Sequence, residues 1–328
     1  MKTIKGGRRI VIAILAGGLL CGAGVQAQTW TPKRPISLIV GFGPGGSADI
    51  LARLVAGPAA EILGVPVVVE NVTGAAGMVA MARLARAKPD GFTIGMGGTG
   101  TNAIAPSLYG ERANYRSPQD FTPITRLSDM ANVFMVRSDS PVKTAKEFID
   151  WLKSSPGTTY GIAGVGTSNH LTAEMLAAQF GLTLTAVPYR SNPQATTDLI
   201  GGAIGFTVDN STTAIPQHQG GRARAVAVST LARLPQLPEV PTIAESGAPG
   251  FSAVAWQGLF GPAGLPPEIT QRLQDAFHRA ISQPEVKSKL EQSGVTVASG
   301  SSEEFARFVD AEIEKWTAVV RRANVTVQ

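Results

Sequence analysis

The sequence predicts an α/β protein of two lobes, each with a mainly parallel sheet flanked by helices, joined by two crossing segments. Apolar strand-like runs alternate with glycine-rich loops and helical patterns along the chain, an order typical of parallel α/β folds. Residues 121–126 have the pattern of a crossing into a second α/β unit. A proline-rich stretch at 234–242 precedes the expected return to the first unit.

The first unit begins with a buried strand at residues 36–40. A helix capped by Ser47 or its neighbour is expected through about Leu63, because apolar residues recur there at near-helical spacing. The elements expected next are a strand at 65–70, a helix at 78–87, a turn at 88–91 and a strand at 92–96.

The second unit repeats this alternation. Its expected elements are strands at 132–136, 159–163, 184–187, 204–208 and 223–229 and helices at 145–153, 171–180 and 195–200. A strand at 254–260 and helices from about 267 and over 303–322 follow. We expect residues 28–125 and 228–328 to form lobe 1 and residues 126–227 to form lobe 2, with hinges near residues 125 and 227.

The N-terminus has the pattern of a secretory signal peptide. Basic residues precede the uncharged run IVIAILAGGLLCGAGV, which ends at Val25-Gln26-Ala27, a small-residue cleavage pattern. The run is too short to be preferred as a permanent membrane span. We therefore expect residues 1–27 to be removed and the mature protein to be periplasmic.

Removal of this segment changes the composition. The chain has 29 Lys and Arg against 24 Asp and Glu. Four of the basic residues lie in the signal, so 25 basic residues remain against 24 acidic ones. A nearly neutral chain without a basic run does not indicate nucleic-acid binding. Cys21, the single cysteine, leaves with the signal, which excludes disulfides and thiolate metal sites.

A glycine-rich loop follows the first strand. Gly41, Gly43 and Gly46 fit the dinucleotide pattern G-x-G-x-x-G, and Glu70 stands near the expected position of a ribose-binding acid. The alternative function is therefore a Rossmann-type NAD-dependent oxidoreductase. Pro44 inside the pattern and the lack of a downstream acid–base pair weigh against it, and free nicotinamide cofactor is not expected outside the cytoplasm.

Three further loops repeat the plan of strand, small polar loop and helix start. They are GMGGTGT at 95–101, AGVGTSNH at 163–170 and VDNSTT at 208–213. One such loop is ordinary βα-turn chemistry. Helix N-termini carry unpaired N–H groups and partial positive charge, so four loops, two from each lobe, indicate an anion held in a cleft.

Catalytic and metal-binding patterns are weak. Gly46 is followed by Ser47 where a Walker A loop needs lysine. Ser168, His170 and Asp209 are the residue types of a catalytic triad, but no G-x-S-x-G elbow surrounds the serine. The three histidines lack paired metal-ligand spacing. We predict no enzymatic activity, cofactor or metal.

The chain resembles the Bug-type periplasmic solute receptors of tripartite tricarboxylate transporters. The resemblance covers nearly all of the mature chain through ordered blocks, among them WTPKRPISLIVGFGPGGSADILARLVA, VVENVTGAAGMVA, GTSNHLTAEML, VPYRSNPQATTDLIGG and WQGLFGPAGLP. It implies a type II periplasmic-binding-protein clamshell that closes over a small carboxylate, amide or aromatic acid. It also implies delivery to membrane subunits or, alternatively, signalling to a membrane sensor kinase. A monomer is expected.

The resemblance also implies the ligand contacts. Asp49 has two interpretations, a first-turn acid that complements the helix dipole or an acceptor of backbone N–H groups that shapes the glycine loop. The expected ligand-binding residues are Phe42, Gly43, Gly45, Gly46, Ser47, Asp49, Thr99, Thr101 and Asn102 from the first lobe and Gly166, Thr167, Ser168, His170, Asp209 and Asn210 from the second.

Overall fold

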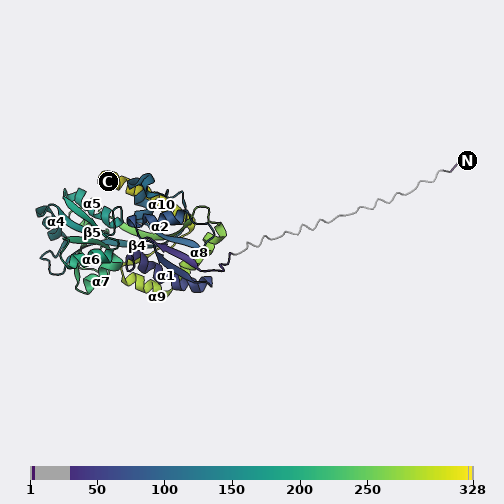
Figure 1. Cartoon of the computed structure of the whole chain (residues 1–328), viewed down its shortest axis with the longest axis horizontal. Helices are drawn as coiled ribbons and strands as arrows, with labels where there is room; N and C mark the ends of the chain where they lie inside the picture. The colour runs from purple at the N-terminus through teal and green to yellow at the C-terminus, as the bar shows by residue number, and fades with distance from the viewer. Residues whose placement is uncertain (1, 4–29, 324, 327–328) are drawn as a thin grey trace.

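The computed structural model describes residues 2–3, 30–323 and 325–326. The predicted signal peptide at 1–27 lies almost entirely outside the described residues. The chain forms a two-lobed α/β fold, and strand β4 (Phe121–Arg137) lies between the lobes (Figure 1). Among the described residues, no helix is long and apolar enough to span a membrane.

The first lobe contains both termini of the described fold. Its strands are β1 (Ile36–Val40), β2 (Val67–Asn71), β3 (Thr93–Gly98), β9 (Val254–Pro262) and β10 (Val295–Val297). Its main helices are α1 (Ser47–Leu63), α2 (Met78–Ala85), α8 (Pro267–Ile281), α9 (Pro284–Gln292) and α10 (Ser302–Arg322). Apolar side chains from α1, α8 and α9 pack with those of β1 and β3 in one core, and side chains of α2 and α10 pack with β9 in another.

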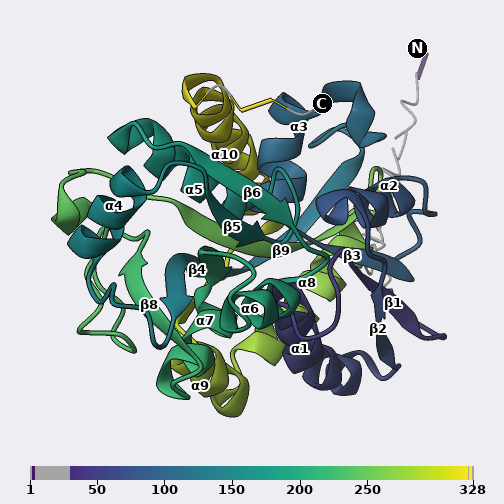
Figure 2. The ribbon, with the colours of Figure 1, turned by 60° about the vertical axis from the view of Figure 1, so that its left-hand side comes forward.

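The second lobe has the same alternation of strands and helices. Its elements are β5 (Thr158–Ile162), β6 (Leu184–Pro188), β7 (Phe206–Asn210), β8 (Ala223–Val228), α4 (Ala145–Ser154), α5 (Ser168–Phe180), α6 (Asn192–Ile200) and α7 (Ser211–Gln219). Phe148, Tyr160 and Phe206 form an aromatic core together with Phe134. Helices α4, α5, α6 and α7 lie on the same side of the molecule as β5 and β6 (Figure 2).

Strand β4 (Phe121–Arg137) joins the two lobes. It pairs with β9 from Phe121 to Ala131 and with β7 and β8 from Asn132 onward. The sequence indicated a crossing at 121–126 and a separate strand at 132–136. A single strand forms instead, because β9 supplies backbone partners through the intervening residues.

The sheet is mixed rather than parallel throughout. The outer strands pair in parallel as expected, β1 with β2 and β3, and β5 with β6 and β7. The central strands β4 and β9 pair antiparallel, because both run between the lobes in opposite directions. Short elements that the pattern did not indicate are η1 (Ala75–Gly77), η2 (Thr99–Ile104), α3 (Ala105–Leu108), η3 (Gly110–Ala113) and η4 (Ala244–Ser246).

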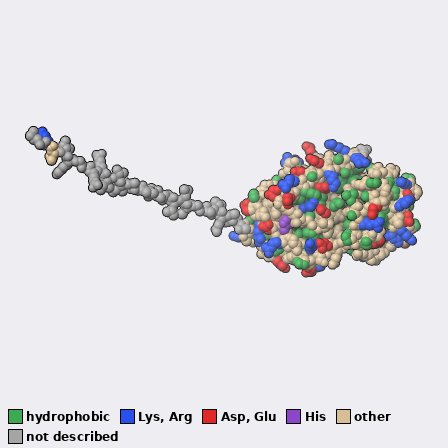
Figure 3. All heavy atoms as spheres, turned by 180° about the vertical axis from the view of Figure 1, so that it is seen from behind, with side chains coloured by type: hydrophobic (Ala, Val, Ile, Leu, Met, Phe, Trp, Pro, Cys, Tyr) green, Lys and Arg blue, Asp and Glu red, His purple; other side chains and the backbone are tan. Residues whose placement is uncertain are grey.

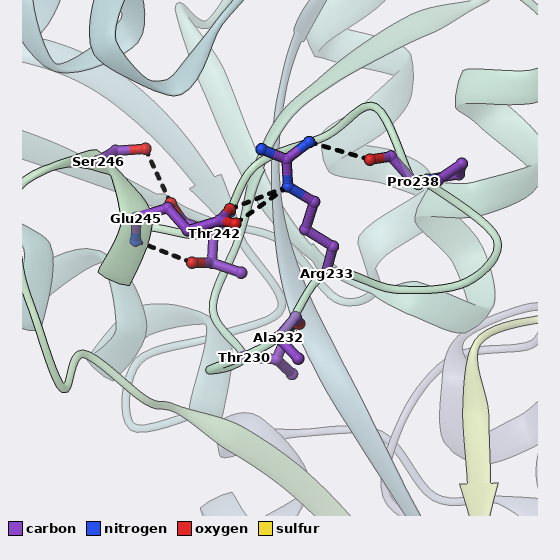
Figure 4. Close-up of polar contacts among 7 residues, drawn as sticks. All are labelled: Thr230, Ala232, Arg233, Pro238, Thr242, Glu245 and Ser246. Atoms are coloured by element: carbon purple, nitrogen blue, oxygen red, sulfur yellow. Dashed lines mark hydrogen bonds and ion pairs between the residues drawn. The ribbon is translucent and has the colours of Figure 1, made fainter.

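The proline-rich segment packs on the second lobe. Arg233 binds the carboxylate of Glu245 and the carbonyl of Pro238, and Thr242 caps the turn that contains Glu245 (Figure 4). Buried side chains between residues 237 and 251 join the cores of the second lobe. The limits at residues 125 and 227 remain a prediction, and this packing favours crossings nearer residues 131 and 253.

The charged surface is mixed on the face seen from behind. Lys and Arg side chains lie among Asp and Glu side chains there, without a continuous basic area (Figure 3). That face therefore lacks the basic stripe of a nucleic-acid-binding surface.

Glu312 accepts hydrogen bonds from two buried indoles, those of Trp256 in β9 and Trp316 in α10. Its Oε2 accepts from Trp256 Nε1 and Trp316 Nε1, both at 2.9 Å. We expect Glu312→Leu to lower the free energy of unfolding by about 2–4 kcal/mol, because two buried N–H groups lose their acceptor. Urea unfolding measures this. The control Glu314→Leu changes an exposed residue of the same helix, and similar losses in both variants would contradict the assigned role.

Candidate functional site

A cavity of about 60 Å³ lies between the two lobes. That volume accommodates several water molecules or a small polar group. Its lining contains no charged side chain and consists of Phe42, Gly46, Ser47, Ala48, Met96, Gly97, Gly98, Thr99, Gly100, Thr101, Ala163, Thr167, Ser168, Asn169, Ser191, Asn192, Asn210, Ala255, Trp256 and Gln257. An uncharged lining leaves backbone dipoles and hydrogen bonds as the means of recognition.

Four helix N-termini meet at this cavity. Helices α1, α5, α6 and α7 begin at Ser47, Ser168, Asn192 and Ser211. The first three follow a strand and a short loop, and α7 follows the last residue of β7 directly. The first turn of each helix has N–H groups without intrahelical partners and a partial positive charge of about half an elementary unit. Their convergence makes the cavity favourable for an anion without any arginine or lysine.

The lobes are closed over the cavity. Ser47 of the first lobe donates from Oγ to Asn210 Oδ1 of the second, at 3.0 Å. Tyr109 donates from its hydroxyl to the carbonyl of Val165 at 2.9 Å. Gly100 approaches so closely that an added Cβ would lie 3.2 Å from the carbonyl oxygen of Gly166. These contacts join the two lobes directly across the cavity.

Asn132, in the middle of β4, orients the cavity wall of the second lobe. Its side chain is fully buried. Its Oδ1 accepts from Ser168 Oγ, Asn169 Nδ2 and Asn210 Nδ2 at 3.3, 2.9 and 3.0 Å. Its Nδ2 donates to Thr172 Oγ1 and the carbonyl of Ala253. Asn132 therefore links two loops of the cavity to the strand that joins the lobes.

The structure brings eight of the fifteen expected ligand-binding residues to the cavity. These are Phe42, Gly46, Ser47, Thr99, Thr101, Thr167, Ser168 and Asn210. The other seven do not line it, and they are Gly43, Gly45, Asp49, Asn102, Gly166, His170 and Asp209. Several of these support the loops, so ligand contact is proposed only for the first set.

Asp49 shapes the glycine loop. Its carboxylate accepts from the backbone N–H of Gly45 at 2.9 Å and from Arg53 and Asn71, each at 2.9 Å. Burial would raise its pKa, but these hydrogen bonds, led by that from Arg53, hold the pKa below its usual value. Gly45 itself has a φ of +78°, a backbone conformation that glycine adopts without strain. Of the two interpretations of Asp49, the loop-shaping one agrees with these contacts.

The remaining supporting residues lie behind the loops. Asn102 Oδ1 accepts from the backbone N–H of Gly98 at 3.1 Å. His170 Nδ1 accepts from the backbone N–H of Gly166 at 3.2 Å, and burial lowers the pKa of this imidazole to about 4. Asp209 accepts from Asn210 and neighbouring side chains, and burial raises its pKa to about 6. None of them has the arrangement of a catalytic triad.

His170 and Asp209 act in opposite directions on acid stability. Acidification from pH 6.5 to 4 destabilises the fold through His170, because the unfolded imidazole takes up a proton and the buried one does not. It stabilises the fold through Asp209, because the folded carboxyl takes up a proton near pH 6 and the unfolded one near 3.8. The two contributions therefore offset each other in the native protein.

We expect Asp209→Asn to lose more stability than the native protein between pH 6.5 and 4. The additional loss is about 3 kcal/mol at most, from a pKa difference of about two units. Unfolding free energies measured across this pH range test this, with the exposed Asp310→Asn as the control. Parallel pH profiles for the native protein and Asp209→Asn would contradict the offset.

Glu70, the acid that the dinucleotide alternative requires for ribose binding, is engaged in other contacts. Glu70 forms an ion pair with Arg83, with Nη2 to Oε2 at 2.9 Å, and accepts from Ser37 Oγ at 3.2 Å. The Arg83 hydrogen bond lowers the pKa of Glu70. An added Cβ at Gly41 would lie 2.6 Å from the Cα of Gly77, so glycine is needed there for backbone packing.

The described residues also contain no group of three His, Cys, Asp or Glu side chains that could hold a metal ion.

Sequence reasoning missed several residues of the site. Ser191 and Asn192 follow β6 and open α6, so the same plan of strand, loop and helix start could have found them. Asn132 and Gln257 lie inside long strands. No local pattern marks these two, because the paired sheet decides which face each side chain occupies.

The two-lobed fold and the cavity between the lobes are those of a solute-binding receptor. The chain belongs to the tripartite tricarboxylate transporter receptor family, whose pattern it matches over residues 51–325. A relative from Pseudomonas sp. strain P51, the UPF0065 protein in the tcbD-tcbE intergenic region, is 34% identical to this chain. The match covers 96% of this chain and 94% of the relative.

Solved structures agree with this membership. The periplasmic binding protein BugD is 32% identical, with a TM-score of 0.86 over 90% of this chain and 100% of its own. A Rhodopseudomonas palustris protein solved with adipate is 32% identical, with a TM-score of 0.86 over 90% and 99% of the two chains. MatC of the same organism, solved with malate, is 33% identical, with a TM-score of 0.84 over 88% and 99%.

Proposed function

We propose that this protein is a periplasmic receptor that captures a small carboxylate between its lobes and delivers it to the membrane subunits of a tripartite tricarboxylate transporter. The observation that carries the proposal is the convergence of four helix N-termini on an uncharged cavity between the lobes. Structural relatives that hold malate or adipate support the same ligand class.

Neutral donors are sufficient to hold a carboxylate. Hydrogen bonds to a charged group contribute roughly 1.5–3 kcal/mol each, and the first turns of helices offer backbone N–H groups without intrahelical partners. Because no fixed cation holds the anion, the ligand is free to leave when the lobes separate. A ligand that contacts both lobes favours the closed state by its differential affinity for that state.

Thermal unfolding of the purified protein, refolded to remove carried-over ligand, tests the proposal. The panel contains di- and tricarboxylates, amino acids, aromatic carboxylates, nicotinamide and NAD. At a hundredfold excess over Kd, a ligand that binds only the folded state adds about 2.7 kcal/mol of stability. We expect a shift with one class of carboxylate and none with NAD. A shift with NAD alone would return the glycine loop to its dinucleotide interpretation.

A further inference from the structure

Two amide oxygens of the cavity lining are buried and have no hydrogen-bond partner among the described residues. They are Gln257 Oε1 from the first lobe and Asn192 Oδ1 from the second. Buried acceptors are almost always paired in native proteins, so each unpaired one requires an explanation. The explanation depends on whether oxygen, and not nitrogen, is the free atom of each amide.

The orientation of Asn192 is fixed by Asp209. The Nδ2 group of Asn192 donates to Asp209 Oδ1. The same oxygen accepts from the backbone N–H of Asn210 at 2.7 Å and from Thr213 Oγ1 at 2.5 Å. Because Asp209 Oδ1 accepts these two hydrogen bonds, it also acts as the acceptor toward Asn192, and the NH₂ group of Asn192 faces it. The oxygen of Asn192 is therefore the free atom.

The orientation of Gln257 follows from a chain of hydrogen bonds that begins at a backbone carbonyl. The carbonyl of Ala253 accepts from Asn132 Nδ2, which leaves Asn132 Oδ1 to accept from Asn210 Nδ2, both at 3.0 Å. Asn210 Oδ1 then accepts from Ser47 Oγ at 3.0 Å. Ser47 Oγ accepts in turn from Gln257 Nε2 at 3.4 Å. Each link fixes the next, so the oxygen of Gln257 is the free atom.

We propose that the ligand carries a hydrogen-bond donor, an ammonium or hydroxyl group, beside its carboxylate, and that the oxygens of Gln257 and Asn192 accept from it. This inference rests on the proposed function, in which the helix N-termini hold the carboxylate. A plain alkyl acid would leave both oxygens unpartnered. Sites built to bond a polar group of the substrate discriminate strongly against analogues that lack that group. The ligand class is therefore hydroxy acids or amino acids.

Calorimetric titration of the refolded protein with three matched series tests this class. The series are propionate, lactate and alanine; succinate, malate and aspartate; and phenylacetate, mandelate and phenylglycine. In whichever series binds, we expect the hydroxy or amino member to bind about tenfold or more tightly than the plain acid. Comparison of those two members then identifies the donor as hydroxyl or ammonium.

The variant Gln257→Met removes one acceptor and keeps a side chain of similar length. We expect the preference for the donor-bearing acid to fall severalfold in this variant. Gln236→Met is the matched control, because Gln236 Oε1 is also buried and unpartnered but lies outside the cavity, with Nε2 bonded to the carbonyl of Glu291. Its preference should match that of the native protein.

The possible results separate the inference about the donor group from the proposed carboxylate receptor function. Equal affinity of the native protein for plain and donor-bearing acids would overturn the inference and leave the carboxylate receptor intact. A lack of binding to every carboxylate tested would overturn both. If Gln257→Met does not fold, the affinity ratio of the native protein still decides.

Discussion

Gly100→Val is expected to weaken ligand binding by about tenfold to a hundredfold and to leave the unliganded protein folded. A Cβ on Gly100 would lie 3.2 Å from the carbonyl oxygen of Gly166 and 3.3 Å from the Cα of Thr167. The two methyl groups of valine would therefore meet backbone atoms of the other lobe on closure. Overpacking of this kind costs about 1–3 kcal/mol, and here the closed state alone bears that cost.

Calorimetry with the tightest carboxylate gives the affinity, and X-ray scattering gives the compaction that accompanies binding. Gly57→Val is the control, because Gly57 lies in helix α1 and an added Cβ there has open space. Unchanged affinity and compaction in Gly100→Val would show that ligand binding does not require the closed contact at this position.

Asn132→Leu is expected to lower the free energy of unfolding by about 3–5 kcal/mol and to abolish detectable ligand binding. The substitution keeps the approximate volume but removes five hydrogen bonds from a fully buried side chain. Each buried group left without a partner costs about 1–3 kcal/mol before relaxation. Ser168 and Asn210 would also lose the acceptor that orients them in the cavity wall.

Urea unfolding and ligand titration measure the two effects of Asn132→Leu. Met130→Leu on the same strand is the control, because it is a volume-conserving change at a buried position and should cost less than about 1.5 kcal/mol. If Asn132→Leu were no more destabilising than Met130→Leu, the hydrogen-bond network would not be essential to the fold.

Local patterns predicted most of the fold. The strand at 36–40 agrees with β1 at both ends, and the helix capped by Ser47 or its neighbour agrees with α1, whose N-cap is Gly46. A short apolar run, a glycine loop and helical spacing coincide there. The continuous strand β4 could not be predicted in this way. Its middle is stabilised by backbone pairing with β9, which lies more than a hundred residues further along the chain.

Local patterns also predicted one part of the candidate site, its loop residues, but not the part that lies in long strands. Loop residues such as Ser47, Thr99 and Ser168 were predictable, because helix starts after parallel strands gather at one edge of a sheet. Asn132 and Gln257 were not, because their roles depend on which strands pair and in which register. His170 was expected to contact the ligand, but it lies behind its loop, where its ring accepts from Gly166.

A crystal structure of the protein with its tightest carboxylate ligand tests the central claim most directly. The predicted result is one ligand in the cavity between the lobes, with its carboxylate at the first turns of α1 and α5 beside Ser47 and Ser168. A carboxylate bound elsewhere, with this cavity unchanged between liganded and unliganded crystals, would contradict the receptor function proposed for this fold.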